Sequence, residues 1–165
     1  MNHILFLTYR MKQGFGVDLV VMNLTREIRL RGHHVSIGCM DMDGNYSDAQ
    51  IFQLPAQAEV VRKVARQLGV DTIVAHSSPF FEILPALAGE FVVYAWEHGE
   101  PTPELMRNKA GILEQKNHKL QHVYPAVRGV IAISEFIATD INWPQATVIH
   151  NGCDHVDDPG PKAGA

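Results

Sequence analysis

The sequence has few cysteines, no surplus of positive charge and no long apolar run, and each absence excludes a class of protein. Its two cysteines, Cys39 and Cys153, form neither a CxxC pair nor a zinc-binding spacing, and they are too few for a disulfide scaffold. We therefore expect a protein of a reducing compartment. The 14 lysines and arginines are outnumbered by 18 aspartates and glutamates, which gives a net charge of −4. Because nucleic-acid binders normally carry the opposite balance, we expect no nucleic-acid partner.

Apolar runs in the chain are short. The most apolar stretch, residues 83–96, contains Pro85 and Glu90 and is too short to span a bilayer. Near the N-terminus only Ile4 to Leu7 form a strongly apolar run, so we expect no signal peptide. These features predict a cytoplasmic, single-domain protein, because 165 residues can bury about 70% of the surface of the unfolded chain.

Apolar runs alternate with amphipathic segments through most of the chain. Residues 3–9 predict a strand buried on both faces, and residues 17–28 carry apolar side chains at helical spacing before a stop at Gly32. Further strands are expected at 35–39, 50–54, 70–75, 91–95, 130–133 and 147–149, further helices at 56–68, 79–88, 103–123 and 134–141, and a polar loop at 41–48. This alternation predicts an α/β fold with a doubly wound, mainly parallel Rossmann-like sheet of six or seven strands.

A glycine-bearing turn, Gly14-Phe15-Gly16, precedes the first expected helix. Ligands of open α/β sheets lie beyond the carboxyl ends of the strands, and a helix N-terminus favours an anion such as a diphosphate. A dinucleotide fingerprint needs a third glycine at position 19, where this chain has Leu19. A nicotinamide or flavin site and a plain tight turn therefore stay open as alternatives to a phosphate site.

Polar residues follow several other expected strands. His76 follows the strand at 70–75, and His98 lies shortly after the strand at 91–95. A histidine at such a position is either a cleft residue or a structural one. Ser134, after the strand at 130–133, is also a good helix N-cap.

The segment 103–123 carries a histidine pair and a local excess of basic residues. His118 and His122 share one helix face, but two ligands do not make a zinc site, so no metal is expected. The basic residues form either a solvated face or a peripheral contact with anionic lipid. They are Arg107, Lys109, Lys116, Lys119 and, beyond the helix, Arg128.

Five segments in a fixed order resemble one known family. They are Gly16 to Val35, which ends in Arg-Gly-His-His-Val, then Val70 to Ser77, Val92 to Gly99, Gly129 to Phe136, and Val148 to Asp154, which contains Asn-Gly-Cys-Asp. Together they resemble the N-terminal half of the retaining GT-B glycosyltransferases of family four. One departure is Phe15, which stands where that family has a second consecutive glycine.

This resemblance implies a transferase that moves a sugar, with retention, from a nucleotide-sugar donor to a glycan, lipid or small-molecule acceptor. Such enzymes work in polysaccharide or glycolipid biosynthesis and need neither a metal nor a cofactor beyond the donor. The resemblance makes His98 the catalytic residue, in contact with the donor sugar. It places Gly14 and Gly16 against the donor diphosphate.

The resemblance also implies roles away from the donor. His76 and Ser134 would line the acceptor side, and Asn151 and Asp154 would shape the hinge. Residues 1–156 would form the acceptor-side domain and 157–165 the start of an interdomain linker.

The family's C-terminal, nucleotide-sugar-binding domain is absent from the sequence. We therefore expect the isolated chain to be inactive and to need that domain in cis or in trans. Two alternatives stay open: a non-catalytic acceptor-binding or partner subunit of a split glycosyltransferase, and a GT-B sugar-nucleotide epimerase.

Overall fold

A computed structural model describes residues 1–12, 14, 16–44, 46, 49–99 and 109–152 of the chain. These residues form a seven-stranded sheet in which all neighbouring strands are parallel, in the order β3-β2-β1-β4-β5-β6-β7. The strands are β1 (His3–Lys12), β2 (His34–Asp43), β3 (Gln50–Gln53), β4 (Thr72–Ala75), β5 (Val92–Glu97), β6 (Gly129–Ala132) and β7 (Thr147–Val148). The order confirms the expected doubly wound parallel sheet, since the chain leaves β1 towards β2 and then returns to β4 on the other side.

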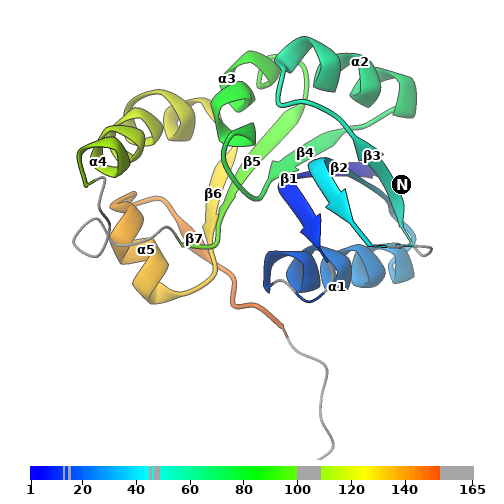
Figure 1. Ribbon diagram of the computed structural model, residues 1–165, viewed down its shortest axis with the longest axis horizontal. Helices are drawn as coiled ribbons and strands as arrows, with labels where there is room; N and C mark the ends of the chain where they lie inside the picture. Colours follow the sequence, from blue (N-terminus) through cyan, green and yellow to red (C-terminus); the bar gives the residue numbers. More distant parts are fainter. Residues whose placement is uncertain (13, 15, 45, 47–48, 100–108, 153–165) are drawn as a thin grey trace, which may run out of the picture.

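Helices lie on both faces of the sheet, with α1 on one face and α2 and α3 on the other (Figure 1). The α-helices of the described residues are α1 (Gly16–Leu30), α2 (Ala58–Leu68), α3 (Leu84–Leu87), α4 (Lys109–His118) and α5 (Glu135–Ile141). Shorter turns are η1 (Phe80–Ile83), η3 (Lys119–Val123) and η4 (Tyr124–Ala126). None of the described helices is long and apolar enough to cross a membrane.

The core consists of two apolar clusters, one on each face of the sheet. Leu5 and Leu7 of β1 belong to the cluster under α2 and α3, whereas Phe6 belongs to the cluster under α1. Successive strand residues point to opposite faces, so one strand supplies both clusters. All three side chains are at most 1% exposed, which confirms that β1 is buried on both faces.

β2 is longer than the sequence predicts. The prediction of a polar loop at 41–48 is wrong for residues 41–43, because β2 continues to Asp43. In the parallel register Arg10 of β1 lies opposite Asp41, and Lys12 lies opposite Asp43. Arg10 Nε is 2.7 Å from an Asp41 carboxylate oxygen. Opposite charges on paired strands therefore extend the β1–β2 pair past the last residue of β4.

Two expected helices differ in the structure. The helix expected at 79–88 is the 3₁₀ turn η1 followed by the four-residue α3, which has a proline in its first turn. The helix expected at 103–123 comprises α4 and the π-helical turn η3, and its residues 103–108 lie outside the described part.

Two lysines of the expected basic face, Lys116 and Lys119, are held in ion pairs within the fold. Lys119 Nζ lies 2.9 Å from Glu97 Oε1, and the two side chains are 3% and 2% exposed. The Tyr124 hydroxyl donates a 2.6 Å hydrogen bond to the same oxygen. Lys116 Nζ lies 2.7 Å from Asp140 Oδ1. A solvated basic face is therefore wrong for Lys116 and Lys119, and neither is available to a lipid surface in this conformation.

We expect Lys119→Met to lower the free energy of unfolding by about 3–5 kcal/mol, because it leaves the Glu97 carboxylate buried without its cation. Adding Glu97→Gln should recover most of this loss, since the new amide oxygen still accepts from Tyr124. Chemical denaturation at neutral pH measures the free energy of unfolding of the single and the double variant. Lys116→Met is the matched control, with an expected loss of about 1 kcal/mol for a more exposed pair. Equal losses for the two single variants would contradict the prediction.

Candidate functional site

A crevice lies at the carboxyl ends of β1 and β4. The strand order reverses here, because β2 and β3 lie on one side of β1 and the later strands lie on the other side. Its volume is about 330 Å³, and its lining residues are Thr8, Tyr9, Arg10, Val17, Asp18 and Ser77. The lining thus combines the end of β1, the first turn of α1 and the loop after β4. Ser77 also joins the loop after β4 to β1, because its hydroxyl accepts a 2.7 Å hydrogen bond from the Tyr9 backbone N–H. Ligands of open α/β sheets bind at this kind of position.

The glycine turn directly precedes Val17 and Asp18, the two α1 residues that line this crevice. Gly14 has a φ of +91°, which favours glycine, and Gly16 begins α1. Beyond its own helix and chain neighbours, a Cβ placed on Gly16 would meet no atom of the described residues within 4 Å. The first-turn N–H groups of a helix have no intrahelical partner, so the open space beside Gly16 suits an anion. Phe15 lies outside the described residues.

Asp18, in the first turn of α1, is buried and hydrogen-bonded within the fold. Its side chain is 3% exposed and accepts a hydrogen bond from the Lys12 backbone N–H, and the Tyr46 hydroxyl lies 3.5 Å from the same carboxylate oxygen. Burial raises the pKa of the Asp18 carboxyl, against the opposing effect of these hydrogen bonds. An exposed acid in the first turn of a helix would repel a phosphate bound at that helix end. The structure instead gives Asp18 a structural role between β1 and α1.

His76 and His98 lie together at the carboxyl ends of β4 and β5. Nδ1 of His76 is 2.9 Å from Nε2 of His98. The His76 ring stacks on Trp96, with centroids 5.2 Å apart, and meets Phe6 edge-on at 5.0 Å. His76 is 2% exposed, whereas His98 is half-buried. His98 is therefore the more exposed ring of the pair, and His76 is the ring enclosed by the core.

Both imidazoles are neutral at physiological pH. Burial lowers the pKa of His98 to about 4, and burial lowers the pKa of His76 well below its usual value, with a smaller effect of His98. A neutral imidazole has one N–H donor and one acceptor nitrogen. His98 can therefore hydrogen-bond a hydroxyl group, but its ring carries no positive charge.

Gly99 forms the turn that follows His98. Its φ is +99°, a conformation that side chains other than glycine rarely adopt, and a Cβ there would lie 2.7 Å from Cδ1 of Ile137. The close approach of α5 to this turn therefore depends on glycine.

Ser134 and Asn151 are the two remaining predicted site residues after β6 and β7 that the structure describes. The Ser134 hydroxyl accepts a 3.2 Å hydrogen bond from the Ile137 backbone N–H, which confirms its role as the N-cap of α5. Asn151 is exposed after β7, and Asp154 lies outside the described residues together with 157–165.

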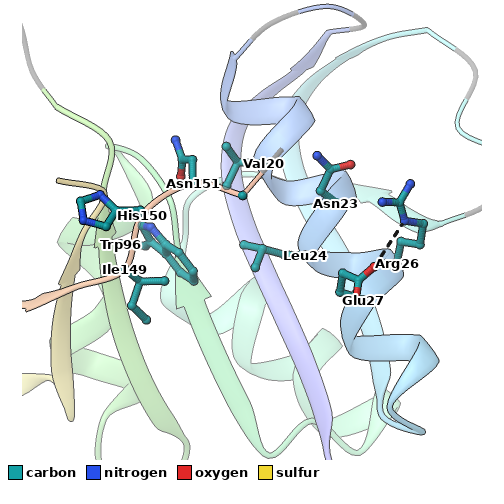
Figure 2. Close-up of a pocket in the computed structure, with 10 residues that line it drawn as sticks. Val20, Asn23, Leu24, Arg26, Glu27, Trp96, Ile149, His150 and Asn151 are labelled. Atoms are coloured by element: carbon teal, nitrogen blue, oxygen red, sulfur yellow. Dashed lines mark ion pairs between the residues drawn. The ribbon is translucent and has the colours of Figure 1, made fainter. Parts of the chain in front are cut away.

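Asn151 instead lines a second cavity, of about 190 Å³, against α1. Figure 2 shows the segment after β7 beside Trp96, with Val20 and Leu24 of α1 on the other side of the cavity. Nε1 of Trp96 is buried there without a hydrogen-bond partner among the described residues. The segment that leaves β7 thus packs next to the strand that carries His98.

No metal site is present among the described residues, where no group of three or more His, Cys, Asp or Glu side chains converges. His118 and His122 do lie close, with ring centroids 4.8 Å apart. Nε2 of His118, however, lies 2.6 Å from a Glu82 carboxylate oxygen.

Three residues around the candidate site, Tyr9, Ser77 and Trp96, are not predicted from the sequence. Tyr9 and Ser77 were not singled out, although Ser77 directly follows His76 and so was signalled by its place after a strand. Trp96 was hidden inside an apolar run, since its stacking on both histidines depends on side-chain orientation.

Solved structures share this fold. A glycosyltransferase from Rickettsia africae has a TM-score of 0.66 at 14% identity, covering 90% of this chain and 43% of its own. Anabaena HepE, in complex with UDP and glucose, has a TM-score of 0.66 at 19% identity, covering 93% and 45%. An alpha-glucosyltransferase in complex with UDP and a 13-mer DNA has a TM-score of 0.59 at 11% identity, covering 92% and 43%. No curated protein sequence matches the chain.

These matches define the fold as the N-terminal half of a GT-B glycosyltransferase. Residues 16–156 also match the sequence family described as Glycosyltransferase Family 4, so the chain belongs to that family, as the five segments predicted. The chain spans less than half the length of the solved structures it matches.

The burial of His98 predicts a loss of stability in mild acid. The pKa is about 4 in the folded chain against 6.5 in the unfolded one, so the unfolded chain takes up the proton first as the pH falls. Between pH 7 and pH 4.5 this linkage lowers the free energy of unfolding by about 2 kcal/mol.

Urea denaturation at both pH values measures this change. His98→Asn should reduce the loss by that amount. His122→Asn, at an exposed site, should leave the loss unchanged. The same loss in the parent protein and in His98→Asn would show that His98 is not the group responsible.

Proposed function

We propose that this chain is the N-terminal, acceptor-side domain of a retaining glycosyltransferase. The reaction moves a sugar from a nucleotide-sugar donor to a glycan, lipid or small-molecule acceptor. The observation that carries the proposal is the position of His98, a neutral imidazole at the carboxyl end of β5 in a domain of Glycosyltransferase Family 4. A neutral imidazole suits a hydrogen bond to a sugar hydroxyl, whose oxygen both donates and accepts.

The glycine turn supplies the second part of the proposed site. The space beside Gly16 and the N-terminus of α1 would accept the donor diphosphate. The helix dipole favours the negative charge that develops there as the sugar leaves. Ser134 and the start of α5 would face the acceptor, and Asn151 and Asp154 would form the hinge.

The proposed reaction needs a second domain. The chain covers 43% and 45% of two of the matched structures, and the second of these holds UDP and glucose. We assign the nucleotide to the half that this sequence lacks, so the chain alone should bind nucleotide sugars weakly and transfer none. No cofactor, metal or nucleic-acid partner is part of the proposal. Activity tests accordingly use the chain joined to, or mixed with, its nucleotide-sugar-binding half.

His98→Ala tests the catalytic role. We expect kcat to fall by about 10²-fold, because a hydrogen bond that positions the donor sugar in the transition state is lost. The melting temperature should fall by only a few degrees, as circular dichroism can establish. His122→Ala is the control at an exposed histidine. An unchanged kcat for folded His98→Ala would assign His98 a structural role.

Gly16→Val tests the diphosphate site. The structure has room for the side chain, so the domain should fold, but the valine would occupy the space proposed for the diphosphate. We expect KM for the donor to rise about tenfold, with less effect on the acceptor KM. Gly89→Val is the matched control, since a Cβ there also meets nothing within 4 Å and the residue lies outside the proposed site. Equal kinetics for the two variants would rule out a diphosphate beside Gly16.

A further inference from the structure

Among the described residues, His76 and His98 are joined by one hydrogen bond, between two ring nitrogens. Nδ1 of His76 lies 2.9 Å from Nε2 of His98. Since both rings are neutral, a single hydrogen atom lies between these nitrogens, carried by one and accepted by the other. The tautomer of one ring therefore determines the tautomer of the other. In either arrangement Nε2 of His98 takes part in this hydrogen bond, so Nδ1 is the ring nitrogen of His98 that remains for a ligand.

His76 is held firmly enough to impose this arrangement. Its backbone N–H donates a 2.7 Å hydrogen bond to the Leu7 carbonyl, which ties it to β1. Its ring lies between Trp96, at 5.2 Å and 23°, and Phe6, at 5.0 Å and 84°. A rotation of the ring would disrupt both contacts in a close-packed core. The less buried His98 is thus the ring that adapts.

A purely structural role explains the position of His76 poorly. Nε2 of His76 is buried without a hydrogen-bond partner among the described residues. An unpartnered polar atom in such a place costs free energy. Phenylalanine would fill the same space between Phe6 and Trp96 without that cost. The polar atom that does find a partner is Nδ1, and the partner is His98.

We propose that His76 is a positioning residue, which holds Nε2 of His98 so that Nδ1 of His98 is the nitrogen that meets the sugar hydroxyl. The functional part of this inference rests on the function proposed above. The hydrogen bond and its effect on the tautomers can be tested on the chain itself. The two parts can therefore fail separately.

Nuclear magnetic resonance of the ¹⁵N-labelled chain at neutral pH tests the hydrogen bond. We expect a scalar coupling between Nδ1 of His76 and Nε2 of His98, and a single, complementary tautomer in each ring. The exposed ring of His122 serves as the internal reference and should show exchange between tautomers. No coupling, together with tautomer exchange at His98, would overturn the inference whatever the enzyme does.

Two substitutions of His76 test the positioning role. His76→Phe keeps the ring packing and removes the hydrogen bond, whereas His76→Asn places an amide atom as many bonds from Cβ as Nδ1. We expect His76→Phe to free the His98 tautomers and to lower kcat about tenfold, with the donor KM changed less than twofold. His76→Asn should restore the His98 tautomer and most of kcat.

The outcomes separate the two proposals. If His98→Ala abolishes transfer but folded His76→Phe retains full kcat, the positioning role is wrong and the proposed function stands. If His98→Ala leaves transfer intact, the catalytic role of His98 and the positioning role of His76 both fail, while the transferase function itself stands. If His76→Phe and His76→Asn lose activity equally while both remain folded, the loss is one of packing, and positioning through Nδ1 is overturned.

Discussion

The parallel pairing of β1 with both β2 and β4 is the constraint on which the rest of the domain depends. β1 is buried on both faces and separates the sheet into a β2–β3 side and a β4–β7 side. The connection after β1 leads to α1 on one face of the sheet, and the connection after β4 leads to α3 on the other face, so a crevice remains between them in the described part of the chain. The crevice, the glycine turn and the two histidine-bearing strands all meet around this one edge.

Much of the fold was predictable because burial leaves a direct signal in the sequence. Strands such as β1 and β4 are apolar runs, and α1 has an apolar stripe with a glycine after it. The extension of β2 to Asp43 was not predictable, since its polar residues are typical of a loop until their partners on β1 are known. Lys119 was missed for a similar reason, because the π-helical turn η3 departs from the helical spacing on which a face is assigned.

The candidate site was predictable in its residues but not in its contacts. The rule that ligands lie beyond the strand ends identified both His76 and His98 from their positions alone. Their hydrogen bond depends on two side-chain rotamers and on the ring of Trp96, none of which the residue spacing determines. Neighbouring residues also differ in electrostatic character, since Glu97 has a buried cation and His98 is kept neutral. Glu97 is the last residue of β5 and His98 follows it directly, and because successive side chains of an extended chain point to opposite sides, the two groups lie in separate environments.

The end of the β1–β2 pair that extends past β4, here called the β1–β2 ribbon, affects where the domain unfolds locally. β4 pairs with β1 only from Ile4 to Leu7, so residues 10–12 have β2 as their one neighbouring strand. Segments with partners on one side open locally at a lower free energy than the centre of a sheet. The Lys12 N–H, however, donates to Asp18, which ties the ribbon tip to the first turn of α1. Local unfolding of this tip and release of the helix start are therefore one cooperative event, beside the glycine turn, that leaves the central strands intact.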